Sequence, residues 1–445
     1  MLRNRVSIAL IAALLPVAAT ALLPAQQHSA RTGSTVIGIA DTVIVAGNEK
    51  TKSYVILDEM LMKPGSPVTA DAIEYDRNRI YSLGLFTSVE IFYDSLGATR
   101  FIYIDVKERW YIIPVPILGF RDGDPKKPFY GGGLLHSNFR GRNQKLYGAV
   151  ILGFDPALSL SFVDPLFDRE NNLSVGTSLS TGTVKNRSTI ESALTGDFDE
   201  RHFDINLSVG KRFTLFESAG ITFGIHNVRV ASYRIGRTAS TDGQDLYLYC
   251  AASYIFDSRN LREYATQGSM VSMSVTKNGL GEADLNYSRI KVDARKYLPL
   301  SADFSLAGRI HGSGVSGTVI PTYAREYFGT GERIRGYYNT VREGENLAGG
   351  TIELRYALLF PRTFVFSAVP IPPEFAVWRF GISLALFADT GIAWFRSERL
   401  RLNDFSTGYG GGVHFLLPYG FILRTEYALN DLGHGQFIID LRTSL

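Results

Sequence analysis

Residues 352–360 read IELRYALLF, and apolar and charged side chains alternate through the first half of this run. Successive side chains of a β-strand point to opposite faces of the sheet. Ile352 and Leu354 therefore lie on one face, and Glu353 and Arg355 lie on the other. A strand of this kind belongs at a boundary between an apolar and a polar environment.

The same alternation recurs from residue 112 to residue 445, in short runs separated by Gly, Asn, Asp and Ser. A soluble β-sandwich also has alternating strands, but this region is long for one. With about ten residues per strand plus turns, it accommodates about 16 strands, an even number that suits an outer-membrane barrel. We therefore predict a mainly β fold in which residues 112–445 form a transmembrane antiparallel β-barrel.

Strand parity assigns the two faces of the predicted barrel. The apolar positions face lipid and the charged positions face the lumen. The charged set consists of Glu353, Arg355, Arg424 and Glu426. Beyond the N-terminus, no segment reaches the ~18 uninterrupted apolar residues of a membrane helix. Residence in a membrane would therefore require the barrel.

Residues 1–30 have the features of a cleavable export signal. Arg3 and Arg5 precede the uncharged apolar run 6–17, and residues 19–21, ATA, match a small-residue cleavage site. An uncleaved membrane anchor is the alternative, but the run is shorter than the ~20 residues that span a bilayer. We expect export across an inner membrane.

Residues 36–109 predict a separate, compact α+β domain. A β-rich run ends at the turn-forming pair Gly47 and Asn48. Two helices should follow, the first capped by Thr51 and the second by Thr69. Two alternating runs then predict two strands, so the expected order is strand, helix, helix, strand, strand.

The second helix of this domain is followed by the sequence LGLF. Gly84 supplies the left-handed conformation with which helices commonly end. The flanking apolar residues are expected in the core or at a hinge, and they are Leu83, Leu85 and Phe86.

Charge and composition argue against several functions. The formal net charge is only +3, without the clustered basic patch that nucleic-acid binding needs. The single cysteine, Cys250, permits no disulfide within the chain, and the seven histidines lack metal-site spacing. No G-x-S-x-G nucleophile elbow occurs. We expect no enzyme activity, no cofactor and no metal ion.

The small domain resembles a POTRA domain, the polypeptide-transport-associated module. The resemblance rests on VAGNEKTKSYVILDEMLMKPG, residues 45–65, and RNRIYSLGLFTSVEI, residues 77–91. It spans the whole unit 36–109. Many bacterial assembly factors carry several POTRA domains, whereas this region holds one, so docking of accessory lipoproteins is an open question.

The second region resembles the barrel of the BamA-like family, which assembles or translocates proteins at outer membranes. Four segments carry the resemblance, and they are FVDP at 162–165, FDSRNLREYATQG at 256–268, GERIRGY at 331–337 and FADTG at 387–391. The last two are the specific ones, in this order and at this separation.

The resemblance implies that a long inserted loop folds back inside the barrel and meets a strand. The loop-tip motif is Arg335, Gly336 and Tyr337, and the strand motif in the lumen is Phe387, Asp389 and Gly391.

Strand parity independently places Asp389 on the lumen face, and the segment 317–345 is long enough to reach it. The planar fork of an arginine can hold a carboxylate through two hydrogen bonds. We therefore expect Arg335 to pair with Asp389 and to hold the loop in place. The alternative is a solvated arginine in a loop and an aspartate in a turn.

The function implied is assembly and insertion of proteins at a bacterial outer membrane, with the POTRA domain in the periplasm. Unfolded outer-membrane proteins would bind an exposed strand edge, residues 86–93, and enter the lipid at a barrel seam. The seam would lie between a strand starting near Ile112 and the strand 436–445. Accessory assembly proteins are further candidate partners. The alternatives are a two-partner-type secretion pore and a passive porin.

Overall fold

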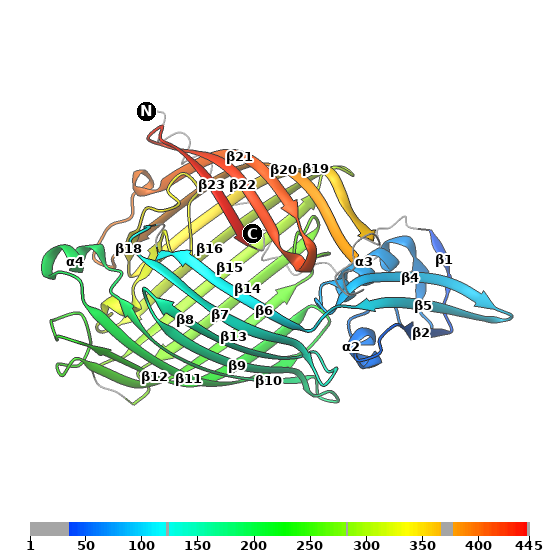
Figure 1. The fold of residues 1–445 in the computed structure, drawn as a ribbon, viewed down its shortest axis with the longest axis horizontal. Helices are drawn as coiled ribbons and strands as arrows, with labels where there is room; N and C mark the ends of the chain where they lie inside the picture. Colours follow the sequence, from blue (N-terminus) through cyan, green and yellow to red (C-terminus); the bar gives the residue numbers. More distant parts are fainter. Residues whose placement is uncertain (1–34, 122–123, 282–283, 366–376, 443–445) are drawn as a thin grey trace.

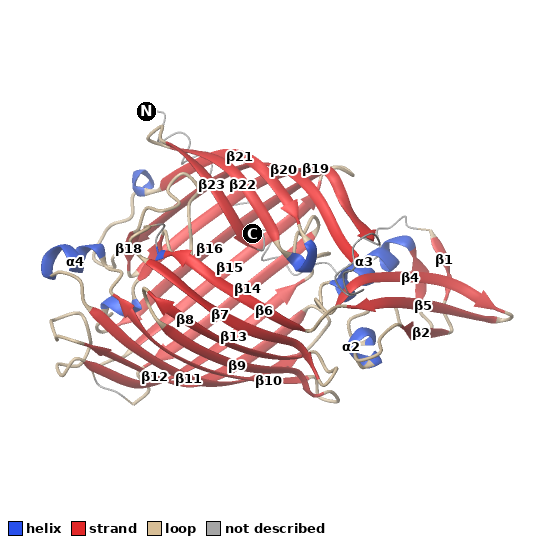
Figure 2. Ribbon diagram, in the orientation of Figure 1, coloured by secondary structure: helices blue, strands red, loops and turns tan. Residues whose placement is uncertain are grey.

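The computed structural model describes residues 35–121, 124–281, 284–365 and 377–442. The expected export signal, residues 1–30, lies outside the described residues. The chain forms a small α+β domain followed by one large β-sheet (Figure 1). Helices lie in the small domain and in connections between strands (Figure 2).

The small domain consists of a three-stranded sheet, a two-stranded ribbon and two helices. Its elements are β1 Val36–Ile39, β2 Thr42–Ala46, α2 Ser53–Leu57, β3 Pro67–Thr69, α3 Ala70–Tyr81, β4 Phe86–Leu96 and β5 Thr99–Glu108. In the sheet, β5 lies between β2, to which it is parallel, and β4, to which it is antiparallel. β1 pairs with β3. Both helices and the sheet contribute to one apolar core.

The two predicted helix caps have different outcomes. Thr69 caps α3, and its Oγ1 accepts a hydrogen bond of 3.1 Å from the backbone N of Ala72. Thr51 does not cap α2, which begins with no side-chain cap. The Thr51 hydroxyl instead lies 2.8 Å from Tyr111 Oη and 2.9 Å from Asn138 Nδ2. Thr51 was assigned wrongly because these tertiary partners, at the barrel junction, take up its hydroxyl.

The first expected strand is also divided, into β1 and β2. The turn after β2 requires Gly47, whose φ is +79° and where a Cβ would lie 1.9 Å from the carbonyl oxygen of Val106. Asn48 Nδ2 donates to the carbonyl of Thr51 at 2.8 Å. Gly84 ends the segment after α3 with φ +69°. The buried core residues beside it are Leu83, Leu85 and Phe86.

A sheet of 16 antiparallel strands forms the rest of the structure, as the sequence predicted. The strands are β6 Ile112–Phe120, β7 Pro128–Phe139, β8 Gln144–Gly153, β9 Ala157–Asp168, β10 Leu173–Lys185, β11 Asp199–Arg212, β12 Glu217–Val230, β13 Gln244–Asp257, β14 Gly268–Asn278, β15 Tyr287–Pro299, β16 Phe304–Gly317, β19 Asn346–Val365, β20 Val377–Trp394, β21 Ser406–Leu416, β22 Ile422–Asn430 and β23 Gly435–Arg442. Sequential strands are neighbours, and the sheet curls into a barrel (Figure 1).

The two ends of the sheet are β6 and β23. These are the strands between which the sequence placed the seam. Within the described part of the chain, no register joins β6 to β23.

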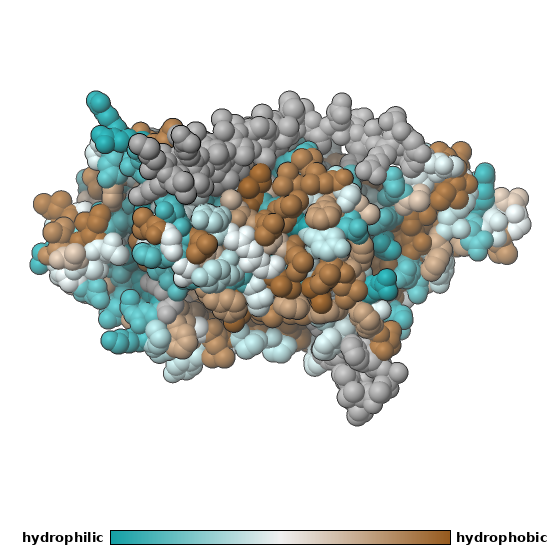
Figure 3. Space-filling view, turned by 90° about the horizontal axis from the view of Figure 1, so that it is seen from above, coloured by the Kyte–Doolittle hydropathy of each residue, from teal (hydrophilic) through white to brown (hydrophobic). Residues whose placement is uncertain are grey.

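Side chains alternate between the two faces of the barrel wall. On β20, Leu384 is 40% exposed and Leu386 is 64% exposed, whereas the alternating residues Ser383, Ala385 and Phe387 are buried. Figure 3 shows hydrophobic residues gathered over the middle of the face it presents. Among the described residues, no helix is long and apolar enough to cross a membrane.

Candidate functional site

The segment between β16 and β19 folds into the lumen. It contains η2 Thr322–Ala324 and the short paired strands β17 Glu326–Phe328 and β18 Arg342–Gly344. The tip of this inserted loop is buried, since Arg335 and Tyr337 are each only 7% exposed.

Arg335 meets Asp389 of β20 inside the barrel. Arg335 Nε donates to Asp389 Oδ2 at 2.8 Å, and Nη2 donates to Oδ1 at 2.8 Å. The backbone N of Arg335 adds a bond of 3.0 Å to Oδ2. The guanidinium carbon also lies 3.5 Å from the ring centroid of Phe387, a cation–π contact. The contact expected from the two motifs is therefore present, and it fixes both position and orientation of the arginine.

Two further carboxylates bind the remaining nitrogen of the same guanidinium. Arg335 Nη1 lies 2.9 Å from Glu353 Oε2 on β19 and 2.9 Å from Glu426 Oε1 on β22. The side chains of all these residues are at most 8% exposed. Parity placed both glutamates in the lumen, but it did not identify them as partners of Arg335. That partnership depends on strand order and register, which alternation does not specify.

Glycines let the loop tip lie directly on the barrel wall. Gly336 has φ +93°, a conformation that L side chains rarely adopt. A Cβ at Gly391 would lie 2.6 Å from the Phe328 ring of the loop. A Cβ at Gly408 on β21 would lie 1.6 Å from the carbonyl oxygen of Arg335. The motifs contained Gly336 and Gly391, whereas Gly408 was missed.

The loop tip is also anchored to the last two strands of the sheet. The Tyr337 hydroxyl donates to the carboxylate of Asp431, in the turn between β22 and β23. Asn430 Nδ2 donates to the Gly336 carbonyl at 3.2 Å. The backbone N of Tyr338 donates to Gln436 Oε1 on β23 at 3.1 Å. The loop tip therefore contacts β23, one side of the seam, as well as β20 and β22 of the barrel wall.

A second segment reaches the same cluster from the opposite end of the barrel. It is the turn 258–267 between β13 and β14, within the segment FDSRNLREYATQG at 256–268. Tyr264 Oη lies 3.0 Å from Nδ1 of the buried His414, and His414 Nε2 lies 3.1 Å from Glu426 Oε1. Arg355 Nη1 donates to the Ala265 carbonyl at 2.9 Å. The sequence marked this turn but identified neither Tyr264 nor His414.

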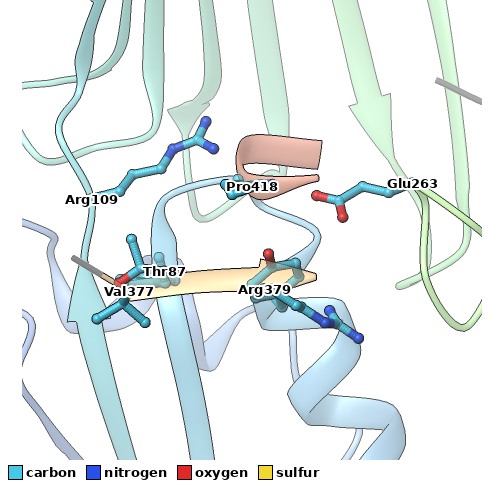
Figure 4. Close-up of a pocket in the computed structure, with 9 residues that line it drawn as sticks. Thr87, Arg109, Glu263, Val377, Arg379 and Pro418 are labelled. Carbon is cyan, nitrogen blue, oxygen red and sulfur yellow. The ribbon is translucent and has the colours of Figure 1, made fainter. Parts of the chain in front are cut away.

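The turn 258–267 also contacts the small domain. Leu261 belongs to the apolar core of that domain, and the backbone N of Arg262 donates to Ser82 Oγ at 3.2 Å. Beside it is a pocket lined by Arg109, Glu263 and Arg379 (Figure 4). Figure 4 shows the Arg109 and Glu263 side chains approaching from opposite sides of the pocket. Contacts thus run continuously from the small domain to the loop tip.

The cluster could hold a cation, and an arginine already fills that role. Glu353, His414 and Glu426 offer ligand atoms within 4.8 Å of one another. Arg335 Nη1 lies between the two carboxylates, and Arg355 Nε donates to Glu353 Oε1 at 2.7 Å. A metal ion at this position would be repelled by both guanidinium groups. The geometry suits a structural role. We call Arg335 together with Asp389, Glu353 and Glu426 the ion-pair clamp.

Comparison with known families agrees with this architecture. The Omp85 superfamily domain matches residues 138–437, which is more than half of the chain. The chain belongs to the Omp85 superfamily. The surface antigen variable number repeat, a POTRA domain, matches residues 39–109 of this Omp85 protein.

Two solved structures illustrate the shared fold. BamA from Haemophilus ducreyi, lacking POTRA domains 1–3, is similar with a TM-score of 0.54 and 15% identity, over 91% of this chain and 83% of that one. CdiB from Escherichia coli is similar with a TM-score of 0.54 and 11% identity, over 92% of this chain and 75% of that one. At these identities the likeness concerns the fold.

Proposed function

We propose that this Omp85 protein inserts unfolded outer-membrane proteins into the bacterial outer membrane, with its POTRA domain in the periplasm. The observation that carries the proposal is the pair of end strands, β6 and β23, which the described residues leave unpaired with each other, beside a loop clamped to β20 and β22. The process requires no nucleotide, because a client gains free energy by burying apolar surface and pairing its backbone in lipid.

The composition of β6 supports a seam that opens. Pro114 and Pro116 have no backbone N–H, and prolines in sheets lie at edges with the nitrogen turned away from the partner strand. β6 nevertheless pairs with β7 without interruption from Ile112 to Phe120. Both prolines therefore remove donors from the unpaired side of β6. Pairing of β6 with β23 is therefore weakened, and an incoming client strand has fewer backbone hydrogen bonds to displace.

The POTRA domain offers a strand edge for clients in the C-terminal part of β4, since residues 87–90 of this strand line a pocket shared with Thr363 and Arg379 of the barrel. β4 is at one edge of the sheet β2-β5-β4, as the sequence analysis expected for residues 86–93. Phe92 is 53% exposed and Leu96 is 80% exposed on this strand. An extended client strand can add to such an edge through backbone hydrogen bonds.

The clamp would keep the lumen closed while a client strand enters between β6 and β23. The inserted loop occupies the lumen from one end, and the turn 258–267 reaches it from the other. This arrangement disfavours a passive porin. Export of one protein through the lumen is the second candidate, because the fold is as similar to CdiB as to BamA. That function would require the clamp to release.

Depletion in the native host, followed by proteomics of the outer membrane and the medium, tests the proposal. Loss of many barrel proteins from the outer membrane is the expected result. An unchanged set of barrel proteins, with one exported protein missing from the medium, would instead establish the secretion function. Complementation with the wild-type gene serves as the control.

A further inference from the structure

A pair of histidines faces the lumen on two neighbouring strands, away from the arginine clamp. His202 lies on β11 and His226 lies on β12, and they are diagonal neighbours, since His202 pairs with Val228, two residues from His226. His202 Nδ1 and His226 Nε2 are 3.4 Å apart, and the two rings meet edge to face. Their side chains are 25% and 24% exposed, so water reaches them.

Each of these imidazoles is fixed through its other nitrogen by a carboxylate. His202 Nε2 lies 3.2 Å from Glu200 Oε2, and His226 Nδ1 lies 3.2 Å from Asp204 Oδ2. An ionised carboxylate can only accept a hydrogen bond, so both of these ring nitrogens carry the proton. In neutral rings, the two nitrogens that face each other then have lone pairs and no proton.

Two lone pairs at 3.4 Å repel each other unless a cation lies between them. The four groups carry a net charge of −2 when both rings are neutral, since they are two carboxylates and two imidazoles. Glu200 is only 4% exposed, and its Oε1 has no hydrogen-bond partner among the described residues. A buried carboxylate in this state is stabilised by a cation nearby.

We propose that His202 Nδ1 and His226 Nε2 bind one divalent transition-metal ion of the Zn²⁺ class. Tetrahedral zinc with Zn–N bonds of about 2.0–2.1 Å places two nitrogen ligands about 3.3 Å apart, close to the observed separation. Water would complete the coordination through the exposed side of the pair. Glu200 and Asp204 would act as the carboxylates that orient metal-binding histidines and raise their basicity.

The surroundings hold this arrangement rigid. Asp204 Oδ1 accepts a bond of 3.0 Å from Asn206 Nδ2, and the Tyr247 ring stacks on His226 at 5.5 Å. The Tyr323 ring, from the stem of the inserted loop, meets His202 edge to face at 6.2 Å. A bound ion would therefore cross-link β11 and β12 at the point where Tyr323 of the inserted loop packs against His202. The inference does not depend on protein insertion being the function.

Zinc titration calorimetry on the full-length, detergent-solubilised protein, prepared without a histidine tag, tests this inference. We expect one Zn²⁺ per chain in the wild type, and no binding at this site in His202→Ala or His226→Ala. Glu200→Gln keeps an acceptor but removes the charge, so affinity should fall about 10–100-fold. His434→Ala removes an exposed histidine elsewhere and should bind as the wild type does.

Cobalt substitution gives a second readout, since Co²⁺ in a nitrogen-coordinated site has a visible spectrum that the His202→Ala protein should lose. Each variant must run faster unheated than boiled on a gel, which shows that the barrel is intact. Zinc binding that is absent from the wild type would overturn the inference and leave a pair that shares only a proton. Binding that persists in the double histidine variant would overturn it equally, and would place the ion elsewhere.

Discussion

Arg335 is a buried cation that is surrounded by more negative charge than it can neutralise alone. Its guanidinium contacts Asp389, Glu353 and Glu426, and Arg355 supplies a second positive charge through Glu353. Removing one member of a buried ion-pair network leaves the others uncompensated, at a cost of about 3–5 kcal/mol. The clamp is therefore cooperative, and its members should not act independently.

Double-mutant analysis of Arg335 and Asp389 tests this cooperativity. Arg335→Ala and Asp389→Ala should each free the loop and impair client assembly, while the barrel stays inserted because its strand ladder is untouched. The double variant should be little worse than either single variant. Loop mobility is measured with a spin label at Asn339 in a Cys250→Ser background.

Arg333→Ala provides the control for this cycle. Arg333 lies in the same loop, stacks on Tyr338 at 4.1 Å and donates to the carbonyl of Thr330. Its loss should leave the label nearly as immobile as in the wild type. Additive losses from Arg335→Ala and Asp389→Ala, with unchanged mobility, would show that the two residues act separately.

Asp76 in the POTRA domain gives a pH dependence with a definite sign. It is fully buried, and burial raises its pKa from 3.8 to about 6, although the backbone N–H groups of Leu61 and Met62 oppose the rise. The folded domain therefore binds the proton more tightly than the unfolded chain does. Its stability should fall by about 2 kcal/mol as the pH rises from 4 to 7.

Urea unfolding of residues 36–109 at a series of pH values measures this dependence. Asp76→Asn should flatten the slope, because the amide does not ionise. Asp71→Asn, which changes an exposed carboxylate in the same helix, should retain it. A wild-type domain that gains stability between pH 4 and 7 would contradict the assignment.

At the scale of elements, the turn 258–267 connects the POTRA domain to the clamp. Tyr264→Phe removes the hydroxyl that lies against His414 Nδ1 and leaves the ring on Arg355. We expect a loss of about 1 kcal/mol in clamp stability, the usual net value of one hydrogen bond, and a modest rise in mobility at Asn339.

Tyr254→Phe is the matched control for this change, because the exposed Tyr254 hydroxyl bonds to Glu217 at 3.0 Å and not to a residue of the clamp. Equal mobility in Tyr264→Phe and Tyr254→Phe would mean that the turn does not support the loop.

The prolines of β6 give a second prediction at this scale. Pro114→Ala combined with Pro116→Ala should restore two N–H donors on the unpaired side and strengthen closure against β23. Insertion of a client barrel into lipid vesicles should then be slower, although the variant itself folds normally. Pro299→Ala, at the end of the interior strand β15, should insert clients at the wild-type rate. Faster insertion by the β6 variant would count against an opening seam.

At the scale of the whole molecule, simple periodicity predicted a large part of the architecture. Alternation predicted the lipid and lumen faces of β20, and chain length gave the strand number, because both follow from geometry that repeats along the strands. The loop-tip motif led to Arg335, and the strand motif led to Asp389. Glu426 and His414 were not predicted to lie at the clamp, because their proximity arises from register between strands. Thr51 was wrongly predicted to cap a helix, because its partners lie at the barrel junction.

The closing prediction concerns the entire chain in its membrane. A 16-stranded antiparallel sheet satisfies its backbone groups internally, apart from the facing sides of β6 and β23, and such sheets resist detergent. The mature protein should therefore fractionate with the outer membrane and migrate faster unheated than boiled. The clamp variants should behave in the same way, because most of the stability lies in the strand ladder and the lipid-facing side chains. Identical mobility with and without heating, together with a soluble periplasmic fraction, would contradict the membrane barrel.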